Sequence, residues 1–162
     1  MKKIEIITPL IEYDSIKELS TEDQNLIIKA QEAVKNAYAP YSKFHVSAAV
    51  LLENNEIITG TNQENAAYPS GLCAERVAVF YANSKYPNVA IKTIAVTIFA
   101  NHDFVDNPGS PCGACRQVLI ESENRFKKPI KVILAGKKKI QVLESVKSLM
   151  PLHFDEHLLE IK

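Results

Sequence analysis

Residues 111–115 read Pro-Cys-Gly-Ala-Cys and, together with Cys73-Ala74-Glu75, decide how this chain is interpreted. Each segment stands at the start of a stretch with helical periodicity. Residues three apart on a helix share a face, so Cys112 and Cys115 can reach one ion. Cys73, from a neighbouring helix, would supply a third thiolate, and three protein ligands leave the fourth tetrahedral position of zinc open. The pattern therefore predicts a catalytic zinc site.

The hydrophobic pattern around these segments predicts an α/β fold. Helices are expected over residues 20–38, with Ser20 as the N-cap, and over 73–83, 111–124, 145–150 and 155–161. Strands are expected over 2–7, 44–52, 57–62, 91–99, 130–135 and 140–143, and one face of the second would carry Phe44, Val46, Ala48, Val50 and Leu52. The hairpin is antiparallel, whereas alternating helices and strands further along imply parallel strands joined by crossovers. We expect a three-layer α/β/α sandwich with a mixed five-stranded sheet. It forms one catalytic domain over residues 20–162, preceded by an N-terminal extension over residues 1–19.

The balance of charge restricts the partners. The 162 residues include 19 basic and 19 acidic side chains, so the formal net charge is zero. The basic clusters at residues 127–131 and 137–139 are small, which favours a small-molecule substrate over nucleic acid. No apolar run approaches the roughly 18–20 residues of a membrane helix, and residues 1–5 do not resemble a signal peptide. We therefore expect a cytoplasmic protein with no nucleic-acid or membrane partner.

The cysteines also invite three other interpretations: a disulfide framework, a redox pair and a structural zinc site. Three cysteines without an export signal argue against a disulfide framework. A C-x-x-C pair also suits a thioredoxin-like redox site, but a third cysteine followed by Ala-Glu has no role there. The histidines that could complete a structural zinc site, none in zinc-ribbon spacing with a cysteine, are His45, His102, His153 and His157. Glu75, two residues after the first ligand, is the candidate for proton transfer, as in zinc deaminases.

Longer segments carry a more specific pattern. They are residues 39–44 (Ala-Pro-Tyr-Ser-Lys-Phe), 60–68 (Gly-Thr-Asn-Gln-Glu-Asn-Ala-Ala-Tyr), 72–76 (Leu-Cys-Ala-Glu-Arg) and 110–118. Through them the chain resembles the homotetrameric, small-subunit branch of the cytidine deaminase family over about residues 24–158. The resemblance implies a cytidine deaminase-like fold, one Zn²⁺ per subunit, and active sites completed by neighbouring subunits. The chain departs from it at Ser47, where the family usually has Gly, and at Thr61, which replaces a common Cys.

The resemblance also implies substrate-binding roles. Asn62 and Glu64 match residues that hydrogen-bond the ribose hydroxyls, for which an amide and a carboxylate supply donors and acceptors. Phe44 matches the ring that packs against the pyrimidine, and Ala74 matches a further substrate contact.

Three more residues take roles at the metal and at the subunit boundary. Phe154 matches a C-terminal aromatic residue delivered from another subunit, and Tyr68 matches a residue near that boundary. Arg76 matches a residue that hydrogen-bonds the cysteine sulfurs. Three thiolates and Zn²⁺ carry a net charge of −1, so a nearby cation and the helix N-termini would help the ion to activate water.

The function implied is hydrolytic deamination of cytidine and deoxycytidine to uridine and deoxyuridine plus ammonia, in pyrimidine salvage. Zinc-activated water attacks C4 of cytosine while Glu75 moves the protons. A deaminase of a nucleoside antibiotic of the blasticidin type is one alternative. A non-catalytic, zinc-stabilised interaction domain is the other.

Overall fold

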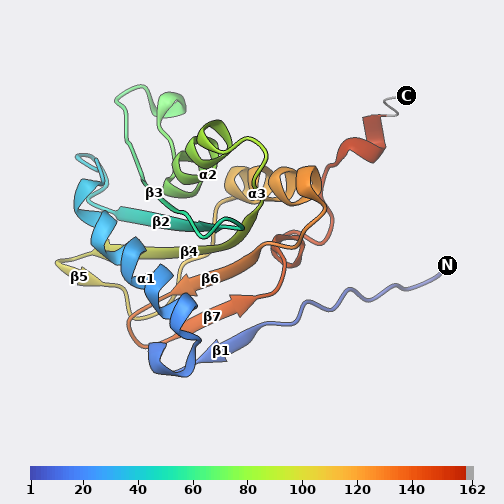
Figure 1. Cartoon of the computed structure of the whole chain (residues 1–162), viewed down its shortest axis with the longest axis horizontal. Coiled ribbons are helices and arrows are strands. Elements are labelled where there is room, and N and C mark those ends of the chain that lie inside the picture. The colour runs from blue at the N-terminus through green and yellow to red at the C-terminus, as the bar shows by residue number, and fades with distance from the viewer. Residues whose placement is uncertain (160–162) are drawn as a thin grey trace.

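The computed structural model of the chain describes residues 1–159. Its α-helices are α1 (Thr21–Ala33), α2 (Ala74–Lys85) and α3 (Gly113–Phe126). The strands are β1 (Ile11–Tyr13), β2 (His45–Leu52), β3 (Ile57–Thr61), β4 (Ile91–Ala100), β5 (Asp103–Phe104), β6 (Lys131–Ala135) and β7 (Ile140–Leu143). Short 3-10 helices are η1 (Ile16–Glu18), η2 (Val34–Asn36), η3 (Tyr68–Ser70), η4 (Val146–Leu149) and η5 (Glu156–Leu159). Figure 1 shows their arrangement.

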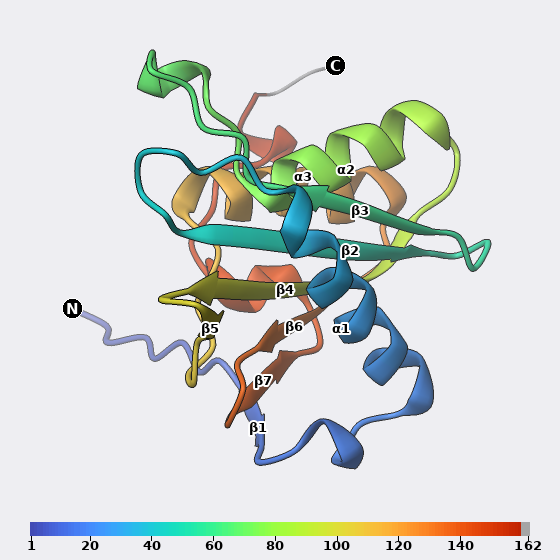
Figure 2. The same cartoon turned by 90° about the vertical axis from the view of Figure 1, so that its left-hand side faces the viewer.

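The strands form one mixed sheet in the order β1-β7-β6-β4-β2-β3, with β5 paired to β4 (Figure 2). Only the β4–β6 pair is parallel within the described residues; every other pair is antiparallel. The mixed α/β sheet is therefore confirmed, but it has seven strands rather than the predicted five. The two additional strands, β1 and β5, are only three and two residues long, too short to stand out as periodic segments.

The predicted strand over residues 2–7 is wrong. Instead, β1 begins at Ile11, which pairs with Val142 of β7. Strand β7 ends at Leu143, so residues 2–7 extend beyond it without a strand to pair with, and they leave the body of the fold (Figure 1). A β-prone sequence forms a strand only where a neighbouring backbone accepts its hydrogen bonds.

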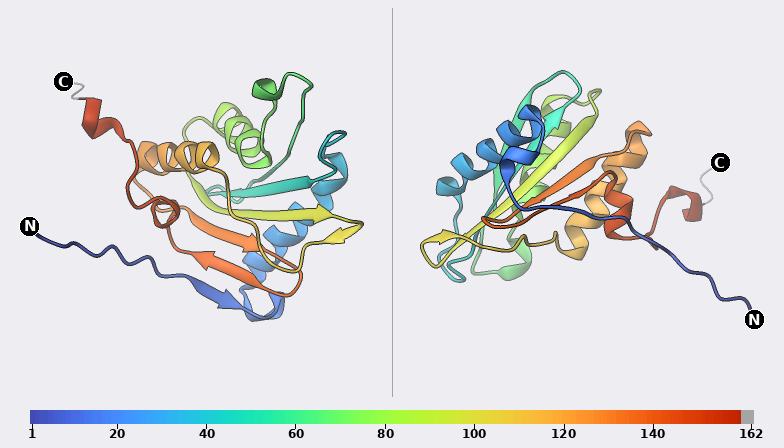
Figure 3. Two further views of the ribbon diagram at one scale, coloured as in Figure 1. Left: turned by 180° about the vertical axis from the view of Figure 1, so that it is seen from behind. Right: turned by 90° about the horizontal axis from the view of Figure 1, so that it is seen from below.

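The helices cover both faces of the sheet, so the expected three layers are present (Figure 3). Strand β2 contributes to both cores because its side chains alternate. Its residues Ala48, Val50 and Leu52 pack with α2 and α3, whereas Ala49 and Leu51 pack with α1. The face predicted for residues 44–52 is thus the one turned towards α2 and α3.

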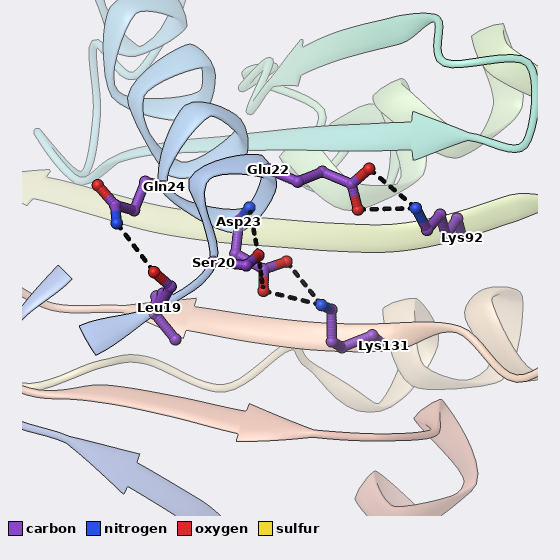
Figure 4. A network of polar contacts seen from close by, with 7 residues as sticks. All are labelled: Leu19, Ser20, Glu22, Asp23, Gln24, Lys92 and Lys131. Atoms are coloured by element: carbon purple, nitrogen blue, oxygen red, sulfur yellow. Dashed lines mark hydrogen bonds and ion pairs between the residues drawn. The ribbon is translucent and has the colours of Figure 1, made fainter. Parts of the chain in front are cut away.

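A polar network fixes the start of α1 to the sheet (Figure 4). Ser20 caps the helix, as predicted, by accepting a hydrogen bond from Asp23 N over 3.2 Å. The buried Asp23 carboxylate pairs with Lys131 of β6 at 2.7 Å, and Glu22 pairs with Lys92 of β4 at 2.7 Å. Since Asp23 is shielded and Glu22 is exposed, the Asp23 pair is the stronger tether.

Glycine at position 60 lets β3 approach α2 closely. A Cβ atom there would lie 2.4 Å from Ala78 N and 2.6 Å from Ala74 O. Those atoms belong to the helix backbone and cannot move independently. The N-terminal end of α2 is therefore held against β3 at a separation that only glycine permits.

Helix ends differ in detail from the prediction. Helix α1 ends at Ala33 and continues as η2 to Asn36, not to residue 38. Of the helix predicted over residues 155–161, η5 is present, and residues 160 and 161 lie outside the described part. Within residues 1–159, no helix has both the length and the apolar character needed to cross a membrane.

Candidate active site

The three cysteines lie at the starts of α2 and α3. Cys73 is the N-cap residue of α2 and Cys112 that of α3, and neither side chain caps its own helix. Cys115 lies one turn further along α3 and is fully buried. The free N–H groups of a first helical turn favour negative charge. Two helix starts therefore stabilise thiolates at the same place.

The spacing of the sulfur atoms fits one zinc ion. Cys112 Sγ lies 3.8 Å from Cys73 Sγ and 3.5 Å from Cys115 Sγ, and all three lie within 4.8 Å of one another. Tetrahedral zinc with Zn–S bonds of about 2.3 Å separates its sulfur ligands by about 3.8 Å. None of the four histidines, all of them in the described part of the chain, belongs to this cluster. The cluster thus offers three sulfur ligands, which would leave the fourth tetrahedral position of a bound zinc ion to water.

Arg76 places a positive charge beside the sulfurs. Its Nη2 donates to Cys73 Sγ over 3.8 Å. Hydrogen bonds from Cys115 and Arg76 lower the pKa of Cys73 to about 5, whereas the contact with Cys73 raises the pKa of Cys115. The sulfur next to the guanidinium is therefore the one most readily ionised. Arg76 Nε is buried and has no hydrogen-bond partner among the described residues. This N–H group can therefore donate a hydrogen bond to a further negatively charged acceptor.

Glu75 lies in the first turn of α2 beside the sulfur cluster. Its side chain is only 4% exposed, and burial raises the pKa of its carboxyl group. A carboxyl group with a raised pKa can both take and release a proton near neutral pH. Its position therefore suits the proton transfer predicted for it.

A cleft of ≈ 780 Å³ opens above the cysteines. The predicted site residues that line it are Phe44, Asn62, Glu64, Tyr68, Cys73, Glu75, Arg76 and Cys112. They come from segments up to 68 positions apart in the chain, joined by the β2–β3 hairpin and the two helix starts. A cleft of this size is typical of small-molecule sites.

Asn62 holds the start of β2 at the cleft. Its Oδ1 accepts from Val46 N and its Nδ2 donates to Phe44 O, both over 2.8 Å. This amide therefore fixes the backbone on either side of His45 and sets the place of the Phe44 ring. One N–H and one lone pair of the amide remain for a ligand.

Glu64 holds the turn that precedes β2. Its Oε2 accepts from Tyr41 N at 2.9 Å and Ser42 N at 3.3 Å, and Ser42 Oγ donates to Oε1. The Ser42 hydrogen bond lowers the pKa of Glu64, so the carboxylate is ionised at neutral pH. Oε2 thus uses both of its lone pairs, whereas Oε1 can accept one further bond.

Two predicted substrate contacts lie outside the cleft lining. Ala74 is fully buried, with its carbonyl directed at Gly60. Phe154 lies on the C-terminal segment and is 55% exposed, and its carbonyl accepts from Gln117 Nε2 over 2.8 Å. Within a single chain the structure does not bring Phe154 to the other site residues. Tyr68 reaches the cleft but is 77% exposed.

Sequence reasoning assigned no role to several residues of the cleft wall. Val96 and Ile98, alternate residues of β4, supply an apolar wall, and Ser42 and Ser110 add hydroxyl groups. Both serines stand inside the motifs that carried the resemblance. The sequence carries no such signal for the β4 residues, because strand alternation says nothing about which end of the strand faces a cleft.

A cleft with three thiolates and a buried carboxyl group at its base defines a zinc-dependent hydrolytic enzyme. The family model described as the cytidine and deoxycytidylate deaminase zinc-binding region matches residues 20–130. The chain belongs to this family, and its cofactor is zinc, for which Cys73, Cys112 and Cys115 are positioned.

Individual relatives agree with the family model. The chain is 44% identical over 100 residues to the cytidine deaminase of Halalkalibacterium halodurans, covering 60% of this chain and 70% of that one. The crystal structure of cytidine deaminase from Burkholderia pseudomallei matches with a TM-score of 0.69 and 36% identity, over 80% of this chain and 97% of that one. The enzyme from Mycobacterium tuberculosis gives a TM-score of 0.63 at 29% identity, over 81% and 95%.

Proposed function

We propose that this chain catalyses the hydrolytic deamination of cytidine and deoxycytidine to uridine and deoxyuridine plus ammonia. The observation that carries the proposal is the three-sulfur cluster with Glu75 buried beside it at the base of a nucleoside-sized cleft. The names of the relatives at 44% and 45% identity, both cytidine deaminases, support it.

Glu75 is the catalytic residue in this proposal. Zinc, when held by Cys73, Cys112 and Cys115, supplies Lewis acidity that lowers the pKa of water. Glu75 takes one proton from the attacking water and transfers it to N3 of cytosine, and it then passes the second proton from the new C4 hydroxyl group to the departing amino group. A C4–O bond forms, the C4–N4 bond breaks, and ammonia leaves. The raised pKa of Glu75 brings the carboxyl group closer to the balance between its ionised and protonated forms, both of which these transfers need in turn.

The cleft wall orients the nucleoside. Phe44 packs against the pyrimidine ring, and the remaining hydrogen-bonding capacity of Asn62 and Glu64 serves the ribose hydroxyls. Ala74 contributes a backbone contact. Arg76 offsets the negative charge of the three thiolates, which otherwise weakens the ion as a Lewis acid.

The assembly proposed is a homotetramer. Phe154 and Tyr68 are exposed aromatic residues in the single chain, and a neighbouring subunit would bring Phe154 to the cleft. Sedimentation of the purified protein tests this, because a fully active monomer contradicts it. We further propose a cytoplasmic setting in pyrimidine salvage, and residues 20–162 as the catalytic domain behind an extension over residues 1–19.

The deciding experiment measures deamination directly. Zinc-loaded protein is incubated with cytidine, and the loss of ultraviolet absorbance is followed as cytosine becomes uracil, with cytosine base and blasticidin S in parallel. Rapid loss with cytidine alone supports the proposal. Turnover of blasticidin S alone favours the antibiotic deaminase. One zinc per chain without turnover of any of the three contradicts the proposal and favours the non-catalytic zinc domain.

A further inference from the structure

Arg116 and Gln117, which directly follow Cys115, both donate hydrogen bonds to the segment of residues 149–155. Arg116 Nη1 donates to Leu149 O over 2.6 Å, and Gln117 Nε2 donates to Phe154 O over 2.8 Å. Among the residues that the structure describes, the other hydrogen bonds and ion pairs of this segment are local, to residues 147–157. Its place on the fold therefore depends on these two contacts and, at its start, on the packing of Leu149 and Met150 against the core.

The same guanidinium also holds the loop that delivers a zinc ligand. Arg116 Nε donates to Pro111 O over 2.8 Å, and Pro111 directly precedes Cys112. One planar group thus joins two backbone carbonyls, one beside the cysteine cluster and one at the start of the C-terminal segment. A guanidinium can donate in two directions from a fixed plane, whereas a lysine ammonium has a single nitrogen.

The hydrogen bonds from Arg116 and Gln117 matter because the contacts that fix the preceding backbone end at η4. The buried Glu123 carboxylate accepts from Val146 N at 3.2 Å and Ser145 Oγ at 2.8 Å, so the backbone is fixed up to that point. Beyond η4 the side chains of Leu152 and Phe154 are 82% and 55% exposed and contribute little packing. Without the Arg116 contact, the packing of Leu149 and Met150 would still restrain the start of the segment, but the part beyond Met150 would be restrained mainly by Gln117.

We propose that Arg116 is a positioning residue for substrate binding, which sets the segment that presents Phe154 relative to the loop that carries Cys112. The inference rests on the proposed contact of Phe154 with the nucleoside in a neighbouring subunit. Arg116 acts through two carbonyl groups and touches neither substrate nor zinc. Its loss therefore weakens substrate binding while leaving the chemical step at Glu75 intact.

The test is Arg116→Lys, with Arg125→Lys as the matched control. Arg125 lies on the same helix and also donates to a carbonyl, Pro87 O at 2.6 Å, but away from the C-terminal segment. Loss of one charged hydrogen bond predicts a rise of about tenfold in KM for cytidine, with kcat within about twofold and zinc content unchanged. Hydrogen exchange of the amides in residues 150–156 should accelerate in Arg116→Lys only. Parallel losses of zinc and kcat, or unchanged exchange, would overturn the proposal.

A double-mutant cycle with Phe154→Ala separates this inference from the proposed function. If Arg116 acts through Phe154, Arg116→Lys adds little to the KM of Phe154→Ala. An equal rise in both backgrounds overturns the proposal. If Phe154→Ala has the wild-type KM, Phe154 does not contact the nucleoside, and the inference fails with that contact. If Phe154→Ala raises KM but hydrogen exchange in Arg116→Lys is unchanged, only the inference about Arg116 is overturned.

Discussion

The base of the cleft and its rim are built in different ways. The base (Cys73, Glu75 and Cys115) lies on the first turns of two helices packed against the sheet, and Glu75 and Cys115 are buried. The rim (Phe44 and Tyr68, with Phe154 in the proposed assembly) lies on loops and on the short helix η3, with exposed fractions of 44%, 77% and 55%. The base lies within one chain, whereas Phe154 would reach the cleft only in the proposed assembly.

The difference separates chemistry from recognition. Groups that hold a metal and move protons need fixed positions, which buried helix starts provide. Exposed aromatic side chains indicate a surface covered by ligand or by another subunit. Changes at the base should therefore alter zinc content, folding or kcat, and changes at the rim should alter KM.

Loss of a buried zinc ligand should have the largest effect. Cys115→Ser should lose zinc and activity together and lower the melting temperature by about 5–15 °C, because metal binding contributes to the stability of the folded state. Zinc content, turnover and thermal unfolding measure this. The control is Ser122→Ala on the same helix, whose buried hydroxyl has no partner among the described residues. Full activity without zinc in Cys115→Ser would contradict the metal assignment.

Removing the proton carrier should reduce turnover without disturbing the metal. Glu75→Gln keeps the size of the buried side chain, and kcat should fall about 10²–10⁴-fold, the usual contribution of general acid–base catalysis. Zinc content and melting temperature should stay near the wild-type values. Turnover like that of the wild type would remove Glu75 from the mechanism.

Filling the contact between β3 and α2 should destabilise the base. Gly60→Ala places a methyl group 2.4 Å from Ala78 N, and overpacking of this kind costs about 1–3 kcal/mol in the free energy of unfolding. Urea unfolding measures the loss. Gly113→Ala is the matched control, since its Cβ would meet no atom within 4 Å. Equal stability changes in the two variants would show that the close approach at Gly60 is unimportant.

A conservative change at the rim should have the smallest effect. Phe44→Leu keeps an apolar side chain but removes the aromatic face, which is worth about 0.5–1.5 kcal/mol in ring contacts. We expect KM for cytidine to rise about two- to tenfold with kcat nearly unchanged. Steady-state kinetics test this, and a fall in kcat alone would move Phe44 from recognition to chemistry.

Local sequence patterns predicted the elements whose causes are local. Ser20 caps α1 through Asp23 N, and the spacing of Cys112 and Cys115 brings their sulfurs to 3.5 Å. Both outcomes follow from the geometry of a single helix turn. The strand expected over residues 2–7 failed because pairing needs a partner strand at the right place, which no local pattern records.

The two substitutions by which the chain departs from the family pattern, Ser47 and Thr61, are explained by tertiary contacts. Ser47, in place of the usual Gly, is buried and donates to Ala30 O of α1 over 2.5 Å. Thr61, in place of a common Cys, donates to Asn36 O over 3.2 Å. Both hydroxyl groups tie the hairpin to the end of the first helix. Neither partner could be inferred from residues 17 and 25 positions away.

The zinc ligands, the neighbouring carboxyl group and the mixed α/β fold could be predicted from the sequence, because helix and strand periodicity is local and the two cysteine segments match the pattern of zinc deaminases. The tertiary structure was needed to show that Asn62 and Glu64 brace the start of β2, that Gly60 lets α2 lie close to β3, and that Arg116 joins the Cys112 loop to the Phe154 segment. These contacts link residues distant in sequence, and their energies depend on distances that the packed sheet and helices establish.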